Sequence, residues 1–446
     1  MHVREQRADV AIVGAGLAGL AAAAYLARAG REVVVFDSGA PGGRAATRTV
    51  DGYSLNRGPH ALYRGGAGVQ VLAELGVSYS GQPSPSRGLW ALRGDEVYRL
   101  PRTAADLALS NLLGPAAKLE LAQFQSRIPQ LDPRELDAEP LSDWLDRAVK
   151  RAEVRQLLEA LIRLSTFAHD PARLSAGAAV RQLQRGSAGV LYLDGGWQSL
   201  VDGLRRAAEA AGARIVPESR VDGVELDEGG RGVALADGSH WRAEQVLITA
   251  RPAVASALSP AVESLRVRAE QAIPMRVACL AVGLRRLPNP DALFALGLDQ
   301  PLYFSVHSES ARLTPEGGAL IHLARYLGSE PAADPAAVER ELEGLLDRFQ
   351  PGWRDELQAR EYLPNMLAVS ALPRADLGGE PGRPGCTVED APGLFLAGDW
   401  VGPKGMLADA SLASARAAAR AILAEHEGAP EAAAPEALAL SGPASS

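Results

Sequence analysis

The feature that most constrains this chain is a glycine-rich turn that directly follows an apolar segment near its start. Residues 9–19 read DVAIVGAGLAG, which spaces Gly14, Gly16 and Gly19 as Gly-x-Gly-x-x-Gly. In such a turn the glycines permit a tight bend, a close approach of the backbone to a pyrophosphate, and close packing of a helix on a strand. The motif predicts a strand, a turn and a helix that together bind a dinucleotide.

An acidic residue follows the next apolar segment. Residues 32–36 are predicted to form a second strand, and Asp37 ends it, 18 residues after Gly19. A carboxylate at this point accepts hydrogen bonds from ribose hydroxyls and repels a 2′-phosphate. The first helix meanwhile directs its free N–H groups at the phosphates. A glycine-rich turn without a ligand is the alternative interpretation.

Size and charge narrow the possible partners and surroundings. A chain of 446 residues suggests two or three structural units, and its net charge of −8 opposes nucleic acid as a partner. The two cysteines, Cys279 and Cys386, form no C-x-x-C pair, which suits a reducing compartment. The apolar stretch 10–27 contains the three motif glycines, so we interpret it as strand, turn and helix. We find no signal peptide and expect a cytoplasmic protein.

Periodicity and turn residues suggest an order of elements along the chain. A hairpin is expected over 89–100, and residues 103–185 are expected to be mostly helical. The other expected helices are 17–29, 197–211 and 409–424. The other expected strands are 9–13, 32–36, 214–216, 221–226, 245–249, 277–284, 302–306, 319–326 and 394–397.

Two further segments refine the nature of the dinucleotide. Gly42-Gly43-Arg44-Ala45-Ala46-Thr47 follows Asp37, and Gly393-Leu394-Phe395-Leu396-Ala397-Gly398-Asp399-Trp400 lies near the C-terminus. With these segments the chain, from residue 9 to about 424, resembles the FAD-dependent amine oxidase and phytoene desaturase superfamily, which also contains protoporphyrinogen oxidases. The resemblance implies FAD as cofactor. It also implies an α/β fold, in which a Rossmann-like, glutathione-reductase-like FAD-binding domain carries an inserted α+β substrate-binding domain.

The resemblance also suggests where the domains begin and end. The FAD-binding domain is expected to be discontinuous, over 8–88, 190–265 and 386–426. The substrate-binding domain, with its helical subdomain, is expected over 89–189 and 266–385. Residues 427–446 consist largely of Ala, Pro, Glu and Ser, have little to bury, and are expected to be disordered.

Residue roles follow from the resemblance. Gly43 and Arg44 are expected at the diphosphate and ribityl chain, Asp399 near the same groups, and Val221 at the adenine. An aspartate-closed turn is the alternative for Gly398 and Asp399. The expected cofactor-binding residues are Gly14, Ala15, Gly16, Leu17, Ala18, Gly19, Asp37, Ser38, Gly43, Arg44, Gly58, Pro59, His60, Val221, Gly398, Asp399, Met406 and Leu407.

No catalytic residue is assigned from the sequence, and no metal site is expected. His60 lies in the stretch that runs beneath the flavin in the family, so it is a candidate acid or base. Its alternative role is to position the loop. His307 and His322 lie on predicted strands and are interpreted as packed or half-exposed side chains.

Two absences narrow the predicted chemistry. No second Gly-x-Gly-x-x-Gly occurs, so no dedicated NADPH domain is expected. Flavin amine oxidases typically carry a lysine at flavin N5, whereas Lys118, Lys150 and Lys404 all lie outside the predicted substrate strands. Met406 also stands where the second aromatic residue of the amine cage is expected. These departures weaken the amine oxidase interpretation.

Residues 167–176 and 194–200 look like segments of phytoene desaturases and protoporphyrinogen oxidases. The predicted reaction is therefore hydride transfer from a C–H bond of a small apolar or conjugated substrate to flavin N5, giving a desaturated product. Oxygen, a quinone or another acceptor is expected to reoxidise the flavin. The alternatives are an amine or amino-acid oxidase, a redox-neutral FAD-dependent isomerase, and a flavin-free carrier like the prenyl-binding GDP-dissociation inhibitors. The intact glycine and aspartate motifs argue against the carrier.

The leucine-rich stretch 107–128 has two interpretations. It could form an apolar entrance or lie on a membrane surface, as in related desaturases. Core packing explains the same spacing, and the acidic net charge favours it. Peripheral membrane contact therefore stays an open alternative to a fully cytoplasmic protein.

Overall fold

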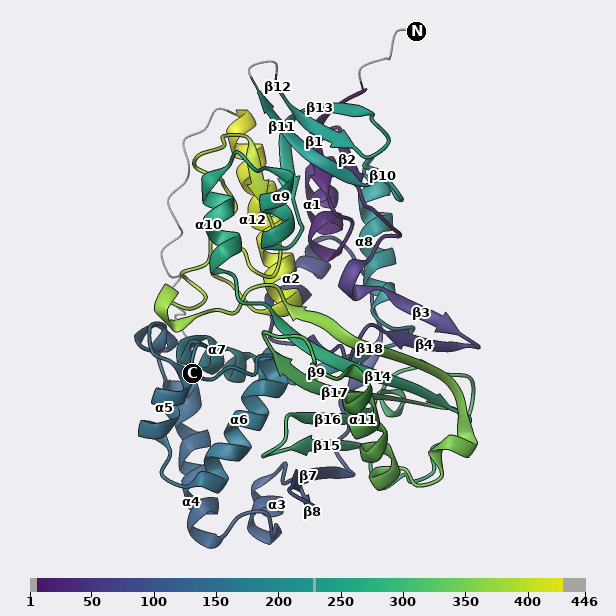
Figure 1. The fold of residues 1–446 in the computed structure, drawn as a ribbon, viewed down its shortest axis with the longest axis vertical. Helices are drawn as coiled ribbons and strands as arrows, with labels where there is room; N and C mark the ends of the chain where they lie inside the picture. The colour runs from purple at the N-terminus through teal and green to yellow at the C-terminus, as the bar shows by residue number, and fades with distance from the viewer. Residues whose placement is uncertain (1–5, 228–229, 428–446) are drawn as a thin grey trace, which may run out of the picture.

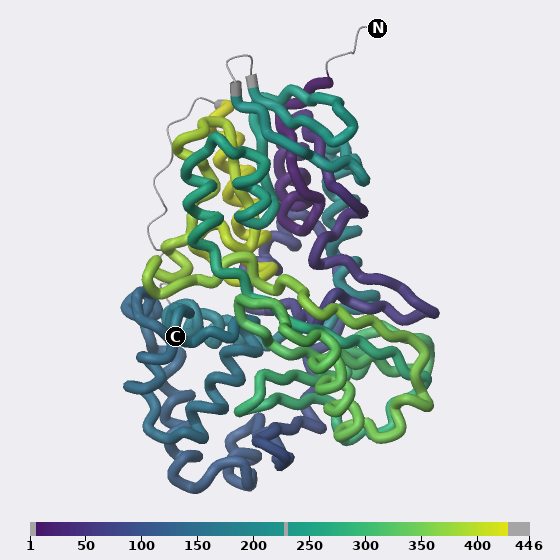
Figure 2. Tube along the Cα trace, in the orientation of Figure 1, coloured from purple at the N-terminus to yellow at the C-terminus, as the bar shows by residue number. Residues whose placement is uncertain are grey.

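The computed structural model describes residues 6–227 and 230–427, which fold into three connected parts. Figure 1 shows a lobe built on a largely parallel sheet at the top, a lobe built on a second sheet below it, and a helical part beside the second sheet. In Figure 2 purple, teal and yellow stretches of the chain come together in the upper lobe. That lobe is therefore assembled from segments far apart in the sequence.

The parallel-sheet lobe contains the strand order β10-β2-β1-β13-β12-β11, with β19 also paired to β13. All four residues of the Val-Val-Val-Phe strand β2 are buried, as expected for a parallel strand covered on both faces. The strands that pair in parallel are β1 (Gln6–Val13), β2 (Val33–Phe36), β10 (Arg214–Val216), β13 (His240–Ile248) and β19 (Leu394–Leu396). An antiparallel hairpin of β11 (Val221–Asp227) and β12 (Gly230–Leu235) extends the sheet at β13.

Helices cover both faces of this sheet. Helix α1 is alanine-rich and almost entirely buried, because its small side chains let neighbouring helices approach closely. Helix α1 spans Leu17–Arg28. Three helices pack with it: α2 (Ala67–Glu74), α8 (Gln198–Ala210) and α12 (Leu407–Glu427). The opposite face is covered by α9 (Pro252–Leu258) and α10 (Glu263–Gln271). The lobe thus has two separate cores, one on each face of the sheet.

The second sheet has the order β18-β14-β17-β16-β15-β7-β8 and is antiparallel except between β15 and β7. Its strands are β7 (Leu89–Arg93), β8 (Glu96–Arg99), β14 (Met275–Leu284), β15 (Phe294–Gly297), β16 (Leu302–Val306), β17 (Ala319–Gly328) and β18 (Leu357–Val369). Helix α11 (Pro335–Phe349) covers one face, where Phe304, Phe349 and Trp353 pack together. Tyr303 and Phe294 belong to the other core of the sheet and line a large cavity.

The helical part packs around one apolar cluster that includes Leu121, Trp144 and Leu158. Its helices are α3 (Ala104–Leu109), α4 (Pro115–Arg127), α5 (Leu141–Ala148), α6 (Ala152–Thr166) and α7 (Ala176–Gly186). Short strands form two further small sheets. One pairs β3 (Thr47–Val50) with β4 (Tyr53–Asn56), and the other has the order β5 (Leu62–Tyr63), β9 (Val190–Leu193), β6 (Gly81–Pro83).

Several elements differ from the expectation. Helix α11 and strand β18 were not predicted. Strand β18 was missed because it alternates only weakly between buried and exposed residues. The last helix runs from Leu407 to Glu427, so it includes the first residue of the tail expected to be disordered. The rest of that tail, 428–446, lies outside the described residues. Over the described ranges, no helix is both long and apolar enough to cross a membrane.

Candidate active site

Four parallel strands end at the same edge of the sheet, so the residues that follow them lie close together there. Gly14 follows β1, Asp37 follows β2, Thr249 follows β13, and Ala397 follows β19. Backbone hydrogen bonds hold these ends together: Gly14 N–H donates to Phe36 O at 2.7 Å, and Thr249 N–H donates to the carbonyl of Val13 at 2.9 Å. Ligands of open α/β sheets bind at this edge.

The three motif glycines have three different environments. Gly14 has a φ of +106°, which L side chains rarely adopt. A Cβ on Gly19 would lie 1.8 Å from the carbonyl oxygen of Gly14, so only glycine permits the close contact of helix and turn. A Cβ on Gly16 would meet nothing within 4 Å, and Gly16 lines the large cavity. Gly16 is therefore the point at which the backbone is open to a ligand.

Asp37 ties the turn to the second strand. Its Oδ2 accepts a hydrogen bond from Ala15 N–H at 2.7 Å, and its Oδ1 accepts one from Gly39 N–H at 3.0 Å. A carboxylate oxygen can accept more than one hydrogen bond, so both oxygens keep capacity for hydroxyl groups in the cavity. The start of α1 adds donors, since it has no side-chain cap and no acid in its first turn. The edge thus combines a hydroxyl acceptor with an anion-binding helix end.

Arg44 and Asp399 form a bidentate ion pair on the other wall. Arg44 Nη2 lies 2.7 Å from Asp399 Oδ1 and Nη1 lies 3.0 Å from Oδ2, and Ser370 N–H also donates to Oδ2 at 2.8 Å. Burial alone would raise the pKa of Asp399, but Arg44 and these hydrogen bonds lower the pKa below its ordinary value. The Asp399 side chain is 2% exposed, whereas that of Arg44 is 42% exposed and lines the cavity.

The large cavity has a volume of about 1080 Å³ and runs from the glycine turn to the second sheet. Small-molecule and cofactor sites typically span about 300–1,000 Å³, so this cavity is as large as the largest of them. Its lining from the sheet edge includes Gly14, Gly16, Leu17, Ala18, Asp37, Gly43, Arg44, Thr249, Arg251 and Gly398. Its lining from the other two parts includes Leu161, Leu164, Phe167, Leu183, Val190, Tyr192, Phe294 and Tyr303.

Most of the residues predicted to bind the cofactor line this single cavity. Those from separate stretches of sequence meet there: Gly14, Gly16, Leu17, Ala18, Asp37, Gly43, Arg44, Gly58, Pro59, His60, Gly398, Met406 and Leu407. The glycine turn, the Gly-Gly-Arg loop, the histidine loop and the start of α12 therefore form one site.

Five predicted residues do not line the cavity. Ala15 is buried beneath the turn, Gly19 packs on Gly14, and Asp399 lies behind Arg44. Ser38 is exposed beside Asp37. These four still adjoin residues that line the cavity.

Val221, the fifth of these residues, starts the outermost strand β11. It pairs with Leu235 of β12, and within the sheet β12 and β13 lie between β11 and β1. Its side chain packs in a core cluster with Phe36 and Trp241. Val221 thus does not line the cavity, but Ser219, two residues before it, donates its N–H to the Asp37 carbonyl at 2.7 Å, so the adenine contact stays a prediction.

His60 lines the cavity as a neutral imidazole. Its Nδ1 lies 2.9 Å from Gly58 O, and because a carbonyl only accepts, Nδ1 carries the proton. Burial, together with the nearby positive charge of Arg44, lowers the pKa of His60 to about 4. The ring lies 4.9 Å from the ring of Trp197. A positioning role and a neutral contact to a ligand both fit this geometry.

Tyr192 and Tyr303, which were not predicted, line the cavity and share a buried polar cluster. Tyr303 Oη lies 3.1 Å from His307 Nε2, and Tyr192 Oη lies 3.2 Å from Ser305 Oγ. The rings of Tyr192 and His307 stack with centroids 3.9 Å apart. Every residue of β16 is buried, so alternation gave no sign of which side chains face the cavity.

Thr249, Arg251 and Asp409 were also missed. Thr249 is the last residue of the predicted strand 245–249, at the edge where ligands bind, so its position could have been inferred from the rule for parallel sheets. Asp409 lies in the first turn of α12, where Oδ1 accepts from Gly68 N–H at 2.7 Å and Oδ2 is buried without a partner. Burial raises the pKa of Asp409 to about 6.

Charged side chains of the cavity are mainly cationic. The arginines that line it are Arg44, Arg57, Arg102 and Arg251, and the acids are Asp37 and Asp409. Lys118, Lys150 and Lys404 are not among its lining residues. Within the described ranges, no group of three or more His, Cys, Asp and Glu residues is arranged to hold a metal ion.

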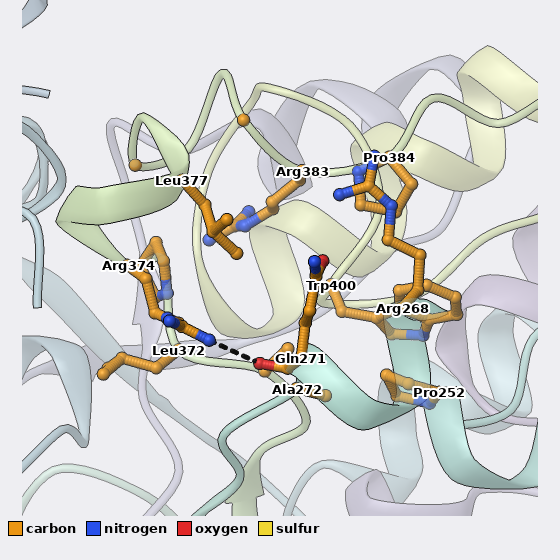
Figure 3. Close-up of a pocket in the computed structure, with 14 residues that line it drawn as sticks. Pro252, Arg268, Gln271, Ala272, Leu372, Arg374, Leu377, Arg383, Pro384 and Trp400 are labelled. Carbon is orange, nitrogen blue, oxygen red and sulfur yellow. Dashed lines mark hydrogen bonds between the residues drawn. The ribbon is translucent and has the colours of Figure 1, made fainter. Parts of the chain in front are cut away.

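A second cavity of about 40 Å³ lies outside this site (Figure 3). It is lined by Arg268, Arg374, Arg383 and Trp400 among others, and it shares no lining residue with the large cavity. Arg374 Nη1 donates to Gln271 O at 2.9 Å across it. This small space is thus separate from the candidate site.

Comparisons with known proteins match this geometry to a family. The sequence model described as flavin containing amine oxidoreductase matches residues 17–423. A Mycobacterium tuberculosis protein named flavin-containing monoamine oxidase AofH is 30% identical over 264 residues, which cover 55% of this chain and 57% of that protein. The match thus spans little more than half the length of this relative.

Two solved structures share the fold. Putrescine oxidase bound to putrescine superposes with a TM-score of 0.72 at 18% identity, covering 94% of this chain and 100% of that one. A protein from Exiguobacterium sp. 255-15 named as a protoporphyrinogen oxidase superposes with a TM-score of 0.69 at 19% identity, covering 94% and 99%. The fold shared with these structures, an α/β fold with a Rossmann-like nucleotide lobe, covers nearly the whole chain.

Proposed function

Since the chain belongs to the flavin-containing amine oxidoreductase family and its cofactor is FAD, we propose that it is an FAD-dependent dehydrogenase of an apolar or conjugated organic substrate. The observation that carries the proposal is the cavity wall contributed by α6, α7, β9, β15 and β16. That wall is mainly aliphatic and aromatic, has Ser165 and Gln182 as polar members, and contains no lysine, aspartate or glutamate.

The residues at the sheet edge fit FAD. The open position at Gly16 and the uncapped start of α1 would hold the diphosphate, and the Asp37 carboxylate would accept from the ribose. Arg44 would face the diphosphate and ribityl portion. Gly58, Pro59, His60 and Met406 would border the ring system, between the sheet edge and the apolar wall.

Electrostatics favour an uncharged substrate over an ammonium ion. Four arginines line the cavity against two acids, and one of those acids, Asp37, already accepts hydrogen bonds from two backbone N–H groups. A cation leaving water would meet no buried carboxylate on the apolar wall, and burying an unpaired charge is strongly unfavourable. The same wall offers dispersion contacts to a hydrocarbon chain or conjugated ring.

Bound FAD supplies the hydride acceptor for the reaction. The chain holds the reacting carbon by packing against Leu161, Leu164 and Phe167, and by the ring faces of Tyr192 and Tyr303. These apolar side chains also exclude water from the reacting bond. Orientation and desolvation are therefore the main contributions of the protein.

Reoxidation is proposed to use a diffusing acceptor such as oxygen or a quinone. The sequence contains a single Gly-x-Gly-x-x-Gly motif, at Gly14, Gly16 and Gly19, so a second dinucleotide domain is not evident. The organic molecule then either leaves the cavity before the acceptor enters or shares the cavity with it.

Amine oxidation is the second candidate, because the curated relative is named a monoamine oxidase and one structural neighbour is a putrescine oxidase. The lack of a lysine in the cavity lining and the aliphatic Leu407 and Met406 beside the flavin position weigh against it. A redox-neutral isomerase is a third, which the same apolar wall would serve.

An anaerobic reduction experiment tests the proposal. The purified FAD-loaded protein is mixed with a panel of apolar polyenes and partly saturated ring compounds, and with a parallel panel of amines and amino acids. We expect loss of the oxidised flavin absorbance with the first panel, and a product two hydrogens poorer by mass spectrometry. Bleaching by amines alone would overturn the proposal, and a product of unchanged mass would indicate an isomerase.

A further inference from the structure

The start of α12 is held by two side chains of a distant loop. Gly405 immediately precedes Met406 and Leu407, which line the cavity. The Gly405 N–H donates to Glu380 Oε2 at 3.2 Å, and the Gly405 carbonyl accepts from Arg383 Nη1 at 2.7 Å. Side chains of the 379–384 loop therefore hydrogen-bond both the N–H and the carbonyl of Gly405. Arg383 projects from this loop in Figure 3.

Glu380 is the centre of this contact. Its side chain is 0% exposed, and Arg185 on α7 donates to both of its oxygens at 2.9 Å. Arg383 adds a second positive charge that attracts Glu380. One buried carboxylate thus links the helical part of the molecule to the first turn of α12.

The backbone at this point needs such support. Gly405 has a φ of +85° and Leu407, the first residue of α12, has a φ of +56°, so the chain passes twice through the left-handed region where the helix begins. An L side chain such as that of Leu407 rarely adopts this conformation, and it persists only where surrounding contacts hold it. Gly405 also has no space for a Cβ, which would lie 2.9 Å from Asp409 Cβ.

We propose that Glu380 and Arg383 are positioning residues that fix the first turn of α12 against bound FAD, and that they thereby set its affinity and reduction potential. A helix N-terminus stabilises negative charge in front of it, and reduced flavin is more negative than oxidised flavin. A displaced first turn would therefore favour the oxidised form. The inference rests on the FAD part of the proposed function and is independent of the substrate.

Three variants and one matched control test it. Glu380→Ala and Arg383→Met each remove one grip on Gly405, while Glu380→Gln keeps an oxygen that accepts from Gly405 N–H. The control is Glu356→Gln, because Glu356 is also a buried carboxylate bound by two arginines, Arg285 and Arg286, but it does not line the cavity. FAD affinity is measured by fluorescence titration, and the reduction potential by equilibration with a reference dye.

We expect Glu380→Ala and Arg383→Met to bind FAD at least tenfold more weakly, with an altered flavin spectrum and a more negative potential. Glu380→Gln should retain part of both properties, and Glu356→Gln should lose only thermal stability. The proposal is overturned if Arg383→Met and Glu380→Gln melt earlier like the control but keep wild-type affinity, spectrum and potential. This comparison holds even where Glu380→Ala does not fold. A wild-type protein that takes up no FAD would instead overturn the proposed function.

Discussion

Arg44 and Asp399 are joined by two hydrogen bonds of 2.7 and 3.0 Å although 355 positions of sequence separate them. The pair fastens the Gly-Gly-Arg loop to the loop that follows β19. Because Asp399 is buried and Arg44 faces the cavity, the acid orients the guanidinium toward the ligand. We therefore propose that the Gly-Asp motif acts on the cofactor site through Arg44.

Asp399→Ala should leave Arg44 and the Ser370 N–H without their acceptor. We expect the free energy of unfolding to fall by up to about 3 kcal/mol, since Arg44 is partly exposed, and FAD affinity to fall at least tenfold. Thermal melts and fluorescence titration measure the two effects. Asp399→Asn, which keeps one acceptor oxygen, should be milder, and equal losses in both variants would contradict this role.

Gly16→Ala and Gly19→Ala should separate cofactor binding from folding. A Cβ at Gly16 meets no protein atom and points toward the cavity, so this variant should fold normally and bind FAD poorly. A Cβ at Gly19 would overlap the Gly14 carbonyl, so that variant should lose both stability and FAD. Circular dichroism melts of the apoproteins, beside FAD titrations, distinguish the two. A destabilised Gly16→Ala apoprotein would argue against an open site there.

Asp37→Ala removes the acceptor of the Ala15 and Gly39 N–H groups and the proposed ribose contact. We expect FAD to bind about tenfold or more weakly, because a hydrogen bond to a charged group contributes about 1.5–3 kcal/mol. Equilibrium dialysis with FAD measures the change. Unchanged affinity would remove Asp37 from the site.

Asp409→Asn should change how stability depends on pH. The folded-state pKa of Asp409 is raised from 3.8 to about 6, so the folded protein binds its proton more tightly than the unfolded chain does. Its contribution to stability is present below pH 3.8 and is lost as the pH rises through 6, a difference of about 3 kcal/mol. The melting temperature of Asp409→Asn, relative to that of the wild type, should therefore rise between pH 4 and pH 7. The exposed Asp95→Asn serves as a control that should show no such trend.

His322→Leu should reduce sensitivity to acid. His322 is fully buried, neither ring nitrogen has a partner, and burial lowers its pKa from 6.5 to about 3. Its neutral form in the fold contributes stability above pH 6.5 that is lost as the pH falls, about 2 kcal/mol by pH 5. The variant should melt higher than the wild type at pH 5 by a margin that shrinks at pH 7. The control His240→Leu, at an exposed position, should not show this pH-dependent gain in melting temperature. If the gain of His322→Leu over the wild type were the same at every pH, the role of His322 in acid sensitivity would be contradicted.

Local backbone rules made the nucleotide part of the site predictable. Gly14 and Gly19 occupy positions where a positive φ or a 1.8 Å clash admits glycine alone, so the spacing carries three-dimensional information by itself. The position of Asp37 follows from the edge of a parallel sheet. The family resemblance then added Arg44 and Asp399, which no local rule would have paired.

The apolar half of the site was not predictable in the same way. Tyr303 lies on a strand whose five residues are all buried, so no alternation distinguishes the face toward the cavity from the face toward α11. Val221 does not line the cavity, and the contact between its backbone and the adenine stays a prediction. Strand β18 combines partly exposed positions on both faces and therefore lacks a clear period. Such facings depend on tertiary packing, which one sequence does not encode locally.

The pairing of β19 with β13 has a consequence for how the protein is made on the ribosome. Gly398 and the residues that open α12 line the cavity, yet Gly398 is translated 384 positions after Gly14. We therefore expect the glycine turn to lack part of its cavity wall until the last strand and helix have been translated. Cofactor capture should then be a late step of biogenesis, and chains truncated before β19 should leave the ribosome without a closed pocket.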